Sequence, residues 1–266
     1  MGEDFAARDQ QDDDRRSVSL TSPPLPEGVV VGGRPEVRVH LGDGADRVRR
    51  LVVRLTDVHP DGRSELITAG VLCPPAGGDR LLIRLRPIVA PVPAGHRLRV
   101  ALGDADFPRL VPLPDPVPFA VRSVRLSVPA LAEDGGSPVD LPVLEAAPEP
   151  AGNDLRVTRD AESGEVEVVD CERVEDTVGP GGHAYRLSSE LRARVGPYAP
   201  GAAVACGTRT GEVRMSTGEV VAVSVTVRCT QTSLWATAEV TTNGSVVLAR
   251  TWETVLVPER PAVRGR

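Results

Sequence analysis

LVVRLTDVHPDGRSELITAGVL, residues Leu51–Leu72, contains two β-branched, apolar segments on either side of a turn. Leu51–Leu55 form the first segment and Ser64–Leu72 the second. Between them, Pro60-Asp61-Gly62 supplies turn chemistry, because Pro presets φ, Asp bonds its own backbone and Gly tolerates a positive φ. The stretch therefore predicts a β-hairpin.

Polar residues interrupt the apolar positions of the first segment at Arg54, Thr56 and Asp57. Such a pattern is typical of an antiparallel sheet with one packed face and one wet face. Asp57 and Asp61 flank His59, so two carboxylates near an imidazole form either a site or a tight polar turn. We favour the turn, since a hairpin connection needs the same residue types.

The composition bounds the class of protein. With 266 residues, 41% of them hydrophobic, the chain can bury one large core or two smaller ones, and its length favours two domains. Aromatic residues make up only 3%, so Val, Leu, Ala and Ile must build the core, and the abundance of Val favours strands.

Charge and hydropathy exclude several functions. A net charge of −6 with scattered Arg residues argues against a nucleic-acid partner. No apolar run approaches the roughly 18 residues of a membrane span, and the acidic amino terminus lacks a signal core, which predicts a cytoplasmic protein. The four cysteines lack the close spacing of zinc or redox motifs, so we expect thiols, no metal and no cofactor; they are Cys73, Cys171, Cys206 and Cys229.

The fold class predicted is all-β: a jelly-roll β-sandwich followed by a second antiparallel β domain. The domains expected are a flexible acidic arm (1–21), the sandwich (22–129), a linker (130–152), a β-meander or sandwich extension (153–258) and a tail (259–266). Short strands separated by Gly/Pro turns predict the sandwich; they are Val29–Val31, Glu36–Leu41, Arg80–Leu85, Ala94–Leu102 and Val121–Val128. Leu98, Val100 and Leu102 should face inward, and Phe107 should count in a core so poor in rings.

The second domain should begin with a hairpin across residues 160–164, continue through an irregular stretch at 170–182, and end in a three-stranded meander. Asn243-Gly244, a strong two-residue hairpin signal, joins its last two strands. Trp235 and Trp252 lie on these neighbouring strands and are expected to meet as a cross-strand pair.

Several motifs occur in an order that resembles one family: Val53–Arg63 ahead of Ile67–Leu72, Pro93–Arg99 with Gly95-His96-Arg97, and Asp106-Phe107-Pro108-Arg109. They resemble the carboxy-terminal jelly-roll domain of X-Pro dipeptidyl-peptidase and cocaine-esterase-like (CocE/NonD) serine hydrolases, over about Ser22–Val128. Asp57, Pro60, Asp61 and Gly62 belong to the first of these motifs.

The resemblance implies a non-catalytic sandwich that packs against an α/β-hydrolase domain and helps to wall its pocket. The family's serine nucleophile lies upstream of the jelly roll, and this sequence contains no Gly-x-Ser-x-Gly elbow. No catalytic residue is carried over. The partner expected is a hydrolase domain or chain, or a second copy through sandwich faces.

Two alternatives remain open. The first is a stand-alone, galactose-binding-like module for a carbohydrate or small ligand, with Trp235, Trp252, Tyr185 and Tyr198 as its candidate aromatic platform. The second is a repurposed small-molecule enzyme without a serine nucleophile.

Charged motif residues are interpreted as structural. We expect His96 to bond backbone at a sandwich corner, and His183, after Gly181-Gly182, to lie on a surface loop. Arg97 and Arg99 are expected to pair with the Asp106 and Arg109 charges across a sheet edge.

Overall fold

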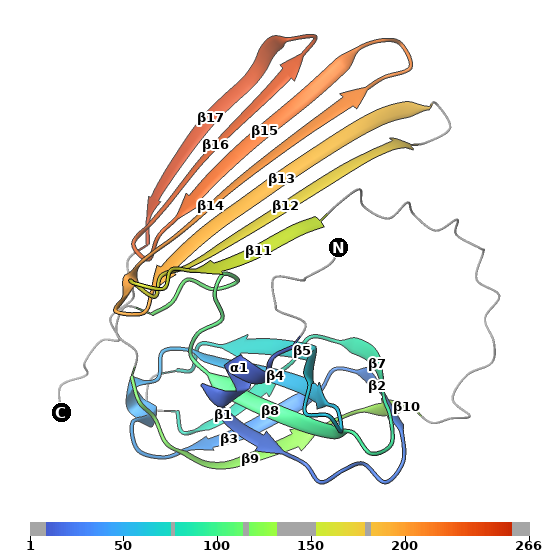
Figure 1. Cartoon of the computed structure of the whole chain (residues 1–266). Coiled ribbons are helices and arrows are strands. Elements are labelled where there is room, and N and C mark those ends of the chain that lie inside the picture. Colours follow the sequence, from blue (N-terminus) through green and yellow to red (C-terminus); the bar gives the residue numbers. More distant parts are fainter. Residues whose placement is uncertain (1–8, 76–77, 114–116, 132–152, 179–181, 257–266) are drawn as a thin grey trace. The chain divides into compact units, whose positions relative to one another are not determined.

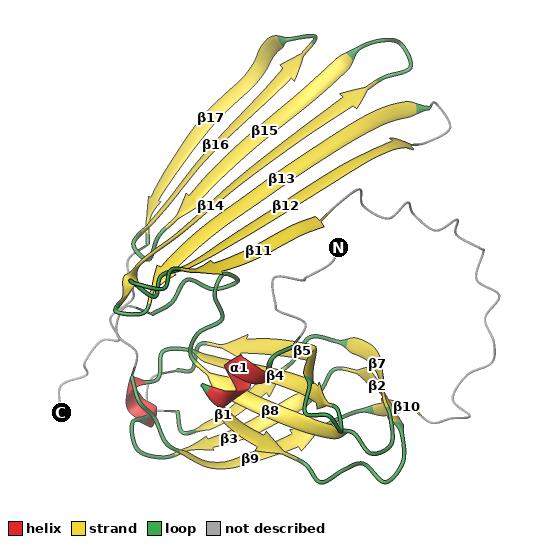
Figure 2. Cartoon of the chain, viewed as in Figure 1, coloured by secondary structure: helices red, strands yellow, loops and turns green. Residues whose placement is uncertain are grey.

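The computed structural model describes residues 9–75, 78–113, 117–131, 153–178 and 182–256. It is nearly all β, with several antiparallel sheets (Figures 1 and 2). The chain divides into two compact units, residues 1–106 with 116–140 and residues 107–115 with 141–266. This confirms the all-β prediction of a sandwich followed by a second antiparallel domain.

The first unit is a two-layered sandwich. Its elements are α1 (Gln11–Arg15), β1 (Val18–Thr21), β2 (Val29–Gly33), β3 (Glu36–Leu41), the 3-10 turn Ala45–Arg47, β4 (Leu51–Val58), β5 (Ser64–Leu72), β6 (Arg80–Arg84), β7 (Ile88–Val92), β8 (Arg97–Gly103), β9 (Val121–Ser127) and β10 (Ala130–Leu131).

One layer has the strand order β1-β8-β4-β5. The other consists of two three-stranded sheets, β6-β3-β9 and β10-β2-β7. Each strand of one sheet is next in the chain to a strand of the other: β2 is followed by β3, β6 by β7, and β9 by β10. Each break between consecutive strands contains a proline: Pro35, Pro87 and Pro129. Proline donates no ladder hydrogen bond, so all three strands bend at the same level.

The core lies between these layers and contains no aromatic ring among its fully buried members. β3 contributes Val37, Val39 and Leu41, and β4 contributes Leu51, Val53 and Leu55. The predicted inward set of β8 is confirmed, since Val100 and Leu102 are buried and Leu98 packs against them. Phe107 is absent from this cluster, and the phenyl ring of Phe119 packs against it instead.

The predicted hairpin is confirmed as β4–β5. Leu51 pairs with Leu72 and Val58 with Ser64, and Gly62 has a φ of +95° in the turn. The prediction of a wet face on β4 is wrong, because every residue of β4 is buried.

The prediction of a flexible arm is also wrong for residues 9–21. β1 pairs with β8, and α1 places Asp14 where only 3% of the residue is exposed. This segment contacts the second face of β4: Arg54 donates to Ser17 Oγ at 3.0 Å and pairs with Asp13 at 3.4 Å. Arg54 of β4 is therefore a partner for the amino-terminal segment.

The second unit is one seven-stranded antiparallel meander, β11 to β17 in chain order. Its strands are β11 (Asn153–Arg159), β12 (Val166–Val178), β13 (His183–Gly196), β14 (Ala199–Arg214), β15 (Val220–Cys229), β16 (Ser233–Thr242) and β17 (Ser245–Val255). The hairpin across 160–164 and the Asn243-Gly244 turn are confirmed, with Asn243 at φ +49° and Gly244 at +80°.

Two predictions for this unit are wrong. Asp170–Val178 is not irregular, because β12 extends to Val178. Trp235 and Trp252 do not form a cross-strand pair, since Trp235 is opposite Glu253 and Trp252 is opposite Ala236. With a side-chain period of two, this one-residue offset places the two indoles on opposite faces of the sheet.

Cys73, Cys171, Cys206 and Cys229 are all free thiols, as expected, although Cys73 is exposed.

Candidate functional site

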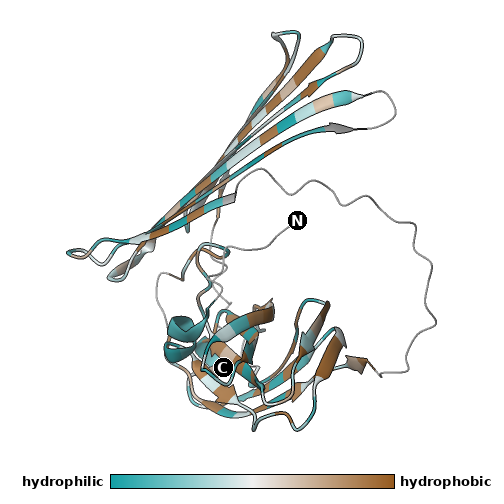
Figure 3. Ribbon diagram, turned by 45° about the vertical axis from the view of Figure 1, so that its right-hand side comes forward, coloured by the Kyte–Doolittle hydropathy of each residue, from teal (hydrophilic) through white to brown (hydrophobic). Residues whose placement is uncertain are grey.

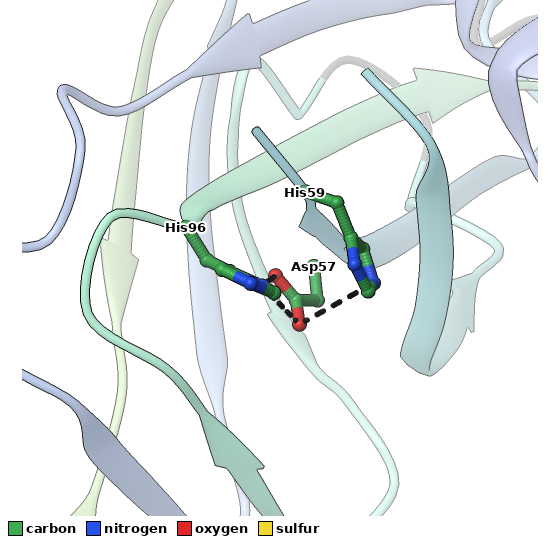
Figure 4. A group of neighbouring side chains, drawn as sticks. All are labelled: Asp57, His59 and His96. Atoms are coloured by element: carbon green, nitrogen blue, oxygen red, sulfur yellow. Dashed lines mark hydrogen bonds and ion pairs between the residues drawn. The ribbon is translucent and has the colours of Figure 1, made fainter. Parts of the chain in front are cut away.

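The most concentrated group of polar side chains in the first unit is Asp57, His59 and His96 (Figure 4). Along β4, Asp57 follows Leu51, Val53 and Leu55 on the core-facing side, and it is paired with Leu98 of β8. His96 lies two residues before Leu98, so alternation brings its side chain to the same side. The cluster therefore closes one end of the sandwich.

Asp57 and His96 form the centre of the cluster. His96 Nδ1 lies 2.8 Å from Asp57 Oδ1 and 3.0 Å from Oδ2. Only 13% of the imidazole and 11% of the carboxylate side chain are exposed. The side chain of His96 thus bonds a carboxylate, which corrects the expectation of a backbone partner. A charge-assisted bond at this depth stabilises the junction of β4 and β8.

His59 packs beside this pair. Its ring centroid lies 4.5 Å from that of His96, with the planes tilted by 47°. His59 Nδ1 lies 3.1 Å from Arg63 Nη2, and its Nε2 lies 3.5 Å from Glu65 Oε2 and 3.9 Å from Asp57 Oδ2. Nε2 is buried and has no hydrogen-bond partner within the described residues.

The turn between β4 and β5 fixes the position of His59. The amide of His59 donates to the Arg63 carbonyl at 2.8 Å, and the Gly62 amide donates to the His59 carbonyl at 2.9 Å. Asp61 Oδ1 accepts from the Arg63 amide at 3.0 Å, so Asp61 has the turn role that we favoured. Asp57, in contrast, belongs to the histidine cluster.

The cluster contains the donor types of a zinc site, with ligand atoms within 4.8 Å of one another. However, a guanidinium can only donate hydrogen bonds, so His59 Nδ1 must accept from Arg63 through its lone pair. In the neutral ring the proton is then on Nε2. A metal at Nε2 would have to displace Arg63 and compete with the Asp57–His96 bond. The arrangement fits a polar clasp better than a preformed metal centre.

A Ser-His-Asp triad needs a hydroxyl within reach of the imidazole whose other nitrogen binds the carboxylate. In the described part of the chain, no serine hydroxyl bonds His59 or His96. Ser64 Oγ is engaged elsewhere, donating to Asp14 Oδ2 at 2.7 Å and lying 3.0 Å from Thr56 Oγ1. The geometry holds a carboxylate–imidazole pair without a nucleophile.

Residues 3–131 match the X-Pro dipeptidyl-peptidase C-terminal non-catalytic domain. The first unit belongs to that family.

Comparison with solved structures gives matches to 16 chains. One is an aminopeptidase from the marine sediment archaeon Thaumarchaeota archaeon, 22% identical with a TM-score of 0.33, where the match covers 38% of this chain and 20% of that one. Another is the Hadza microbial sialidase Hz136, 8% identical with a TM-score of 0.21, covering 86% of this chain and 75% of that one. No curated protein matches. These low TM-scores support no inference about function.

The remaining motif residues of the X-Pro dipeptidyl-peptidase C-terminal domain have structural positions. Pro60 and Gly62 belong to the β4–β5 turn, and Gly95, with a φ of +82°, donates its amide to the Leu25 carbonyl at 2.9 Å. Phe107 and Pro108 are joined by a cis peptide bond.

The predicted pairing of Arg97 and Arg99 with Asp106 is wrong. Arg97 Nη1 donates to the Ser22 carbonyl at 3.1 Å, and Arg99 Nη1 binds Asp14 Oδ2 at 2.8 Å. Asp106 acts on Arg50 instead: burial lowers the pKa of that guanidinium, while the Asp104 and Asp106 carboxylates oppose the shift. Asp14 went unnoticed in the sequence because nothing local marks it as a partner of β8.

An open, mainly apolar groove of about 1060 Å³ lies along β2 and β7 of this domain. Leu25, Val29, Val92, Leu98 and Leu131 are among its lining residues. Leu131 is 52% exposed, and Val30 is 39% exposed. The groove is therefore a hydrophobic surface formed by residues of the first unit alone.

The candidate aromatic platform does not assemble. Tyr198 is 95% exposed, but Trp235 and Trp252 lie on opposite faces of the β11–β17 sheet. The one ring contact among the described residues joins His59 and His96. Within the described residues, no helix has the length and apolar character needed to cross a membrane.

Proposed function

We propose that this chain is the non-catalytic β portion of a CocE/NonD-like serine hydrolase, of the X-Pro dipeptidyl-peptidase or acyl-esterase type, and acts by packing on or completing an α/β-hydrolase domain. The observation that carries the proposal is the match of residues 3–131 to a domain defined as non-catalytic in peptidases.

The side-chain chemistry of the described residues supports a structural role. The Asp57–His96 pair has no hydroxyl to activate, and Arg63 and Glu65 surround His59. Such a network fixes the end of a sandwich, because each group has a charged neighbour at short range. It offers no bond-breaking step.

The apolar groove is the surface that we assign to the hydrolase. Exposed apolar surface of this kind is costly to leave in water and marks interaction sites. Val30 and Leu131 lie on β2 and β10, which pair with each other, so a partner would meet a surface formed by hydrogen-bonded strands.

The proposal can be tested by mixing the purified chain with an α/β-hydrolase that is encoded beside it. We expect an equimolar complex on size exclusion and a changed kcat or KM of the hydrolase towards aminoacyl or ester substrates. Leu131→Asp should weaken the complex at least tenfold, because it places a charge in the groove. Leu20→Asp is the matched control: Leu20 is 43% exposed and lies on β1, but it does not line the groove.

The proposal fails if the two proteins neither associate nor change each other's activity. It is also contradicted if Leu131→Asp and Leu20→Asp weaken the complex equally, since the groove would then have no special part in docking.

A further inference from the structure

The seven-stranded sheet of the second unit has one apolar face and one polar face. The pairing register places Val168, Ala193 and Ala205 in one row across β12, β13 and β14, which defines the apolar face by the alternation of side chains. Along the same strands the opposite face carries mainly charged and hydroxyl side chains, including Arg186, Glu190, Thr208 and Thr226. Brown and teal segments alternate along these ribbons in Figure 3.

Within the described residues of this unit, much of the apolar face is exposed, although Val168 and Ala193 at one end of it are buried. Val223 is 39% exposed, Leu248 41% and Trp252 47%, and all three lie on this face. Among the sheet residues whose burial is described, the buried hydrophobic ones are Val168, Ala193 and Ala203. An antiparallel sheet normally buries such a face against a second layer.

We propose that a second copy of this chain covers the apolar face, so that two β11–β17 sheets pack face to face across a two-fold axis. The axis runs along the strands between β14 and β15. It places β12 of one copy over β17 of the other, β13 over β16, and β14 over β15.

The area of the face suits such a dimer. Strands of ten residues, such as β15 and β16, are about 33 Å long, and the six overlapping strands β12 to β17 at about 4.8 Å spacing give roughly 950 Å² on each partner. A standard stable interface buries about 800 Å² per partner.

One pair of charges near the edges of the face is complementary about this axis. One cross-strand row contains Glu172, Ser189, Arg209, Val225, Ala238 and Arg250, in order from β12 to β17. Reversing the strand order while keeping the row places Glu172 opposite Arg250 of the second copy, and Arg209 opposite Val225. The dimer therefore has two equivalent Glu172–Arg250 pairs near its rim.

Among the residues that the structure describes, neither Glu172 nor Arg250 forms an ion pair within its own copy. Glu172 accepts a long bond of 3.4 Å from Ser189 Oγ, and Arg250 makes no ion pair within the described residues. Both are thus available to a partner. Rim pairs of opposite charge set the register of an interface.

Sedimentation velocity and light scattering of the full-length chain test the proposal. We expect a concentration-dependent dimer of about 56 kDa, twice the 28.1 kDa of one chain. Glu172→Arg or Arg250→Glu alone should weaken the dimer at least tenfold, because each creates two like-charge pairs. The double variant should restore the dissociation constant to within about threefold of the original.

Val223→Glu should abolish the dimer, while Ser224→Glu, on the opposite face of the same strand, should leave it intact. Circular dichroism identifies any variant that fails to fold, and the charge exchange then decides the matter.

A chain that stays monomeric at high concentration overturns the proposal, since the face would then be covered from within the chain or left for another protein. The proposal is also overturned if the double variant Glu172→Arg, Arg250→Glu does not regain the affinity that each single variant loses. The two copies would then meet through another contact, such as edge pairing of β17.

Discussion

The two units of this chain share one sequence pattern and differ in what their strands bury. In the first, β3, β4, β6 and β8 alternate apolar and polar residues, and the apolar sides meet to form a closed core. In the second, β12 to β17 alternate in the same way, but among the described residues of that unit no second sheet packs on the apolar side.

This difference shows that period-two alternation establishes a sheet but not its partner. A strand with one apolar side requires something to cover that side, and the covering element contributes most of the stability. In the first unit the cover is in the same chain, whereas we assign the cover of the second to another copy.

The largest expected effect contrasts two leucines. Leu55 is 0% exposed in the core of the first unit, and Leu248 is 41% exposed on the open face. Leu55→Ala should cost about 2–5 kcal/mol of unfolding free energy, because it leaves a cavity. Leu248→Ala should cost less than about 1 kcal/mol in the monomer, since little apolar area is removed from a buried site.

Urea unfolding at low protein concentration measures both, with the two units followed as separate transitions where they differ. Equal losses of unfolding free energy in the two variants would contradict the contrast between the two units, because Leu248 would then have to be as closely packed as Leu55.

A second, smaller effect concerns the amino-terminal segment. Asp14 Oδ2 accepts from Arg99 at 2.8 Å and from Ser64 at 2.7 Å, with only 2% of the side chain exposed. Asp14→Ala should cost about 1–3 kcal/mol, because it removes the charged acceptor of the buried Ser64 hydroxyl and of the part-buried Arg99 guanidinium. Thermal unfolding with a chemical denaturant series gives the value.

Asp12→Ala is the matched control on the same helix, since the Asp12–Arg15 pair is largely exposed and should contribute less than about 1 kcal/mol. An equal loss of stability in both variants would contradict the claim that Asp14 anchors α1 on β4 and β8.

The smallest effects have opposite signs at two aspartates of the second unit. Burial, with a further contribution from the Glu172 charge, raises the pKa of Asp170, and one of its oxygens is buried without a hydrogen bond. Stability is therefore lost as pH rises through the carboxyl range and stays lost at neutral pH. Asp170→Asn should raise Tm by a few degrees at pH 7, and the gain should vanish on acidification.

Asp160, in contrast, accepts hydrogen bonds from the Ser163 amide and hydroxyl and from the Glu162 amide, which lower its pKa. Its contribution is present at neutral pH and is lost as pH falls through the lowered pKa. Asp160→Asn should thus lower Tm at pH 7. Scanning calorimetry of both variants at one protein concentration checks the signs, and equal signs would contradict the assignment.

The sequence predicts the elements that local chemistry determines. Pro60-Asp61-Gly62 and Asn243-Gly244 specify their turns because a positive φ is required at Gly62, Asn243 and Gly244. The alternation of β3 identifies its buried side for the same local reason.

Tertiary contacts account for what the sequence does not predict. Gln11–Arg15 is too short and polar to mark a stable helix by itself, and its helix is held by Asp14 contacts with residues 50 and 85 positions away. His59 and His96 meet only because β4 pairs with β8, a pairing that neither strand signals. The Trp235 prediction was wrong by one residue of register, which reverses the face.

The central claim is that this chain supplies structure and no nucleophile to a hydrolase. Labelling of the purified full-length chain with a fluorophosphonate probe tests it most directly, because only an activated serine reacts. We expect no labelling beyond that of the heat-denatured chain, with a known serine hydrolase labelled in parallel. Stoichiometric labelling of one serine in the folded chain would contradict the account.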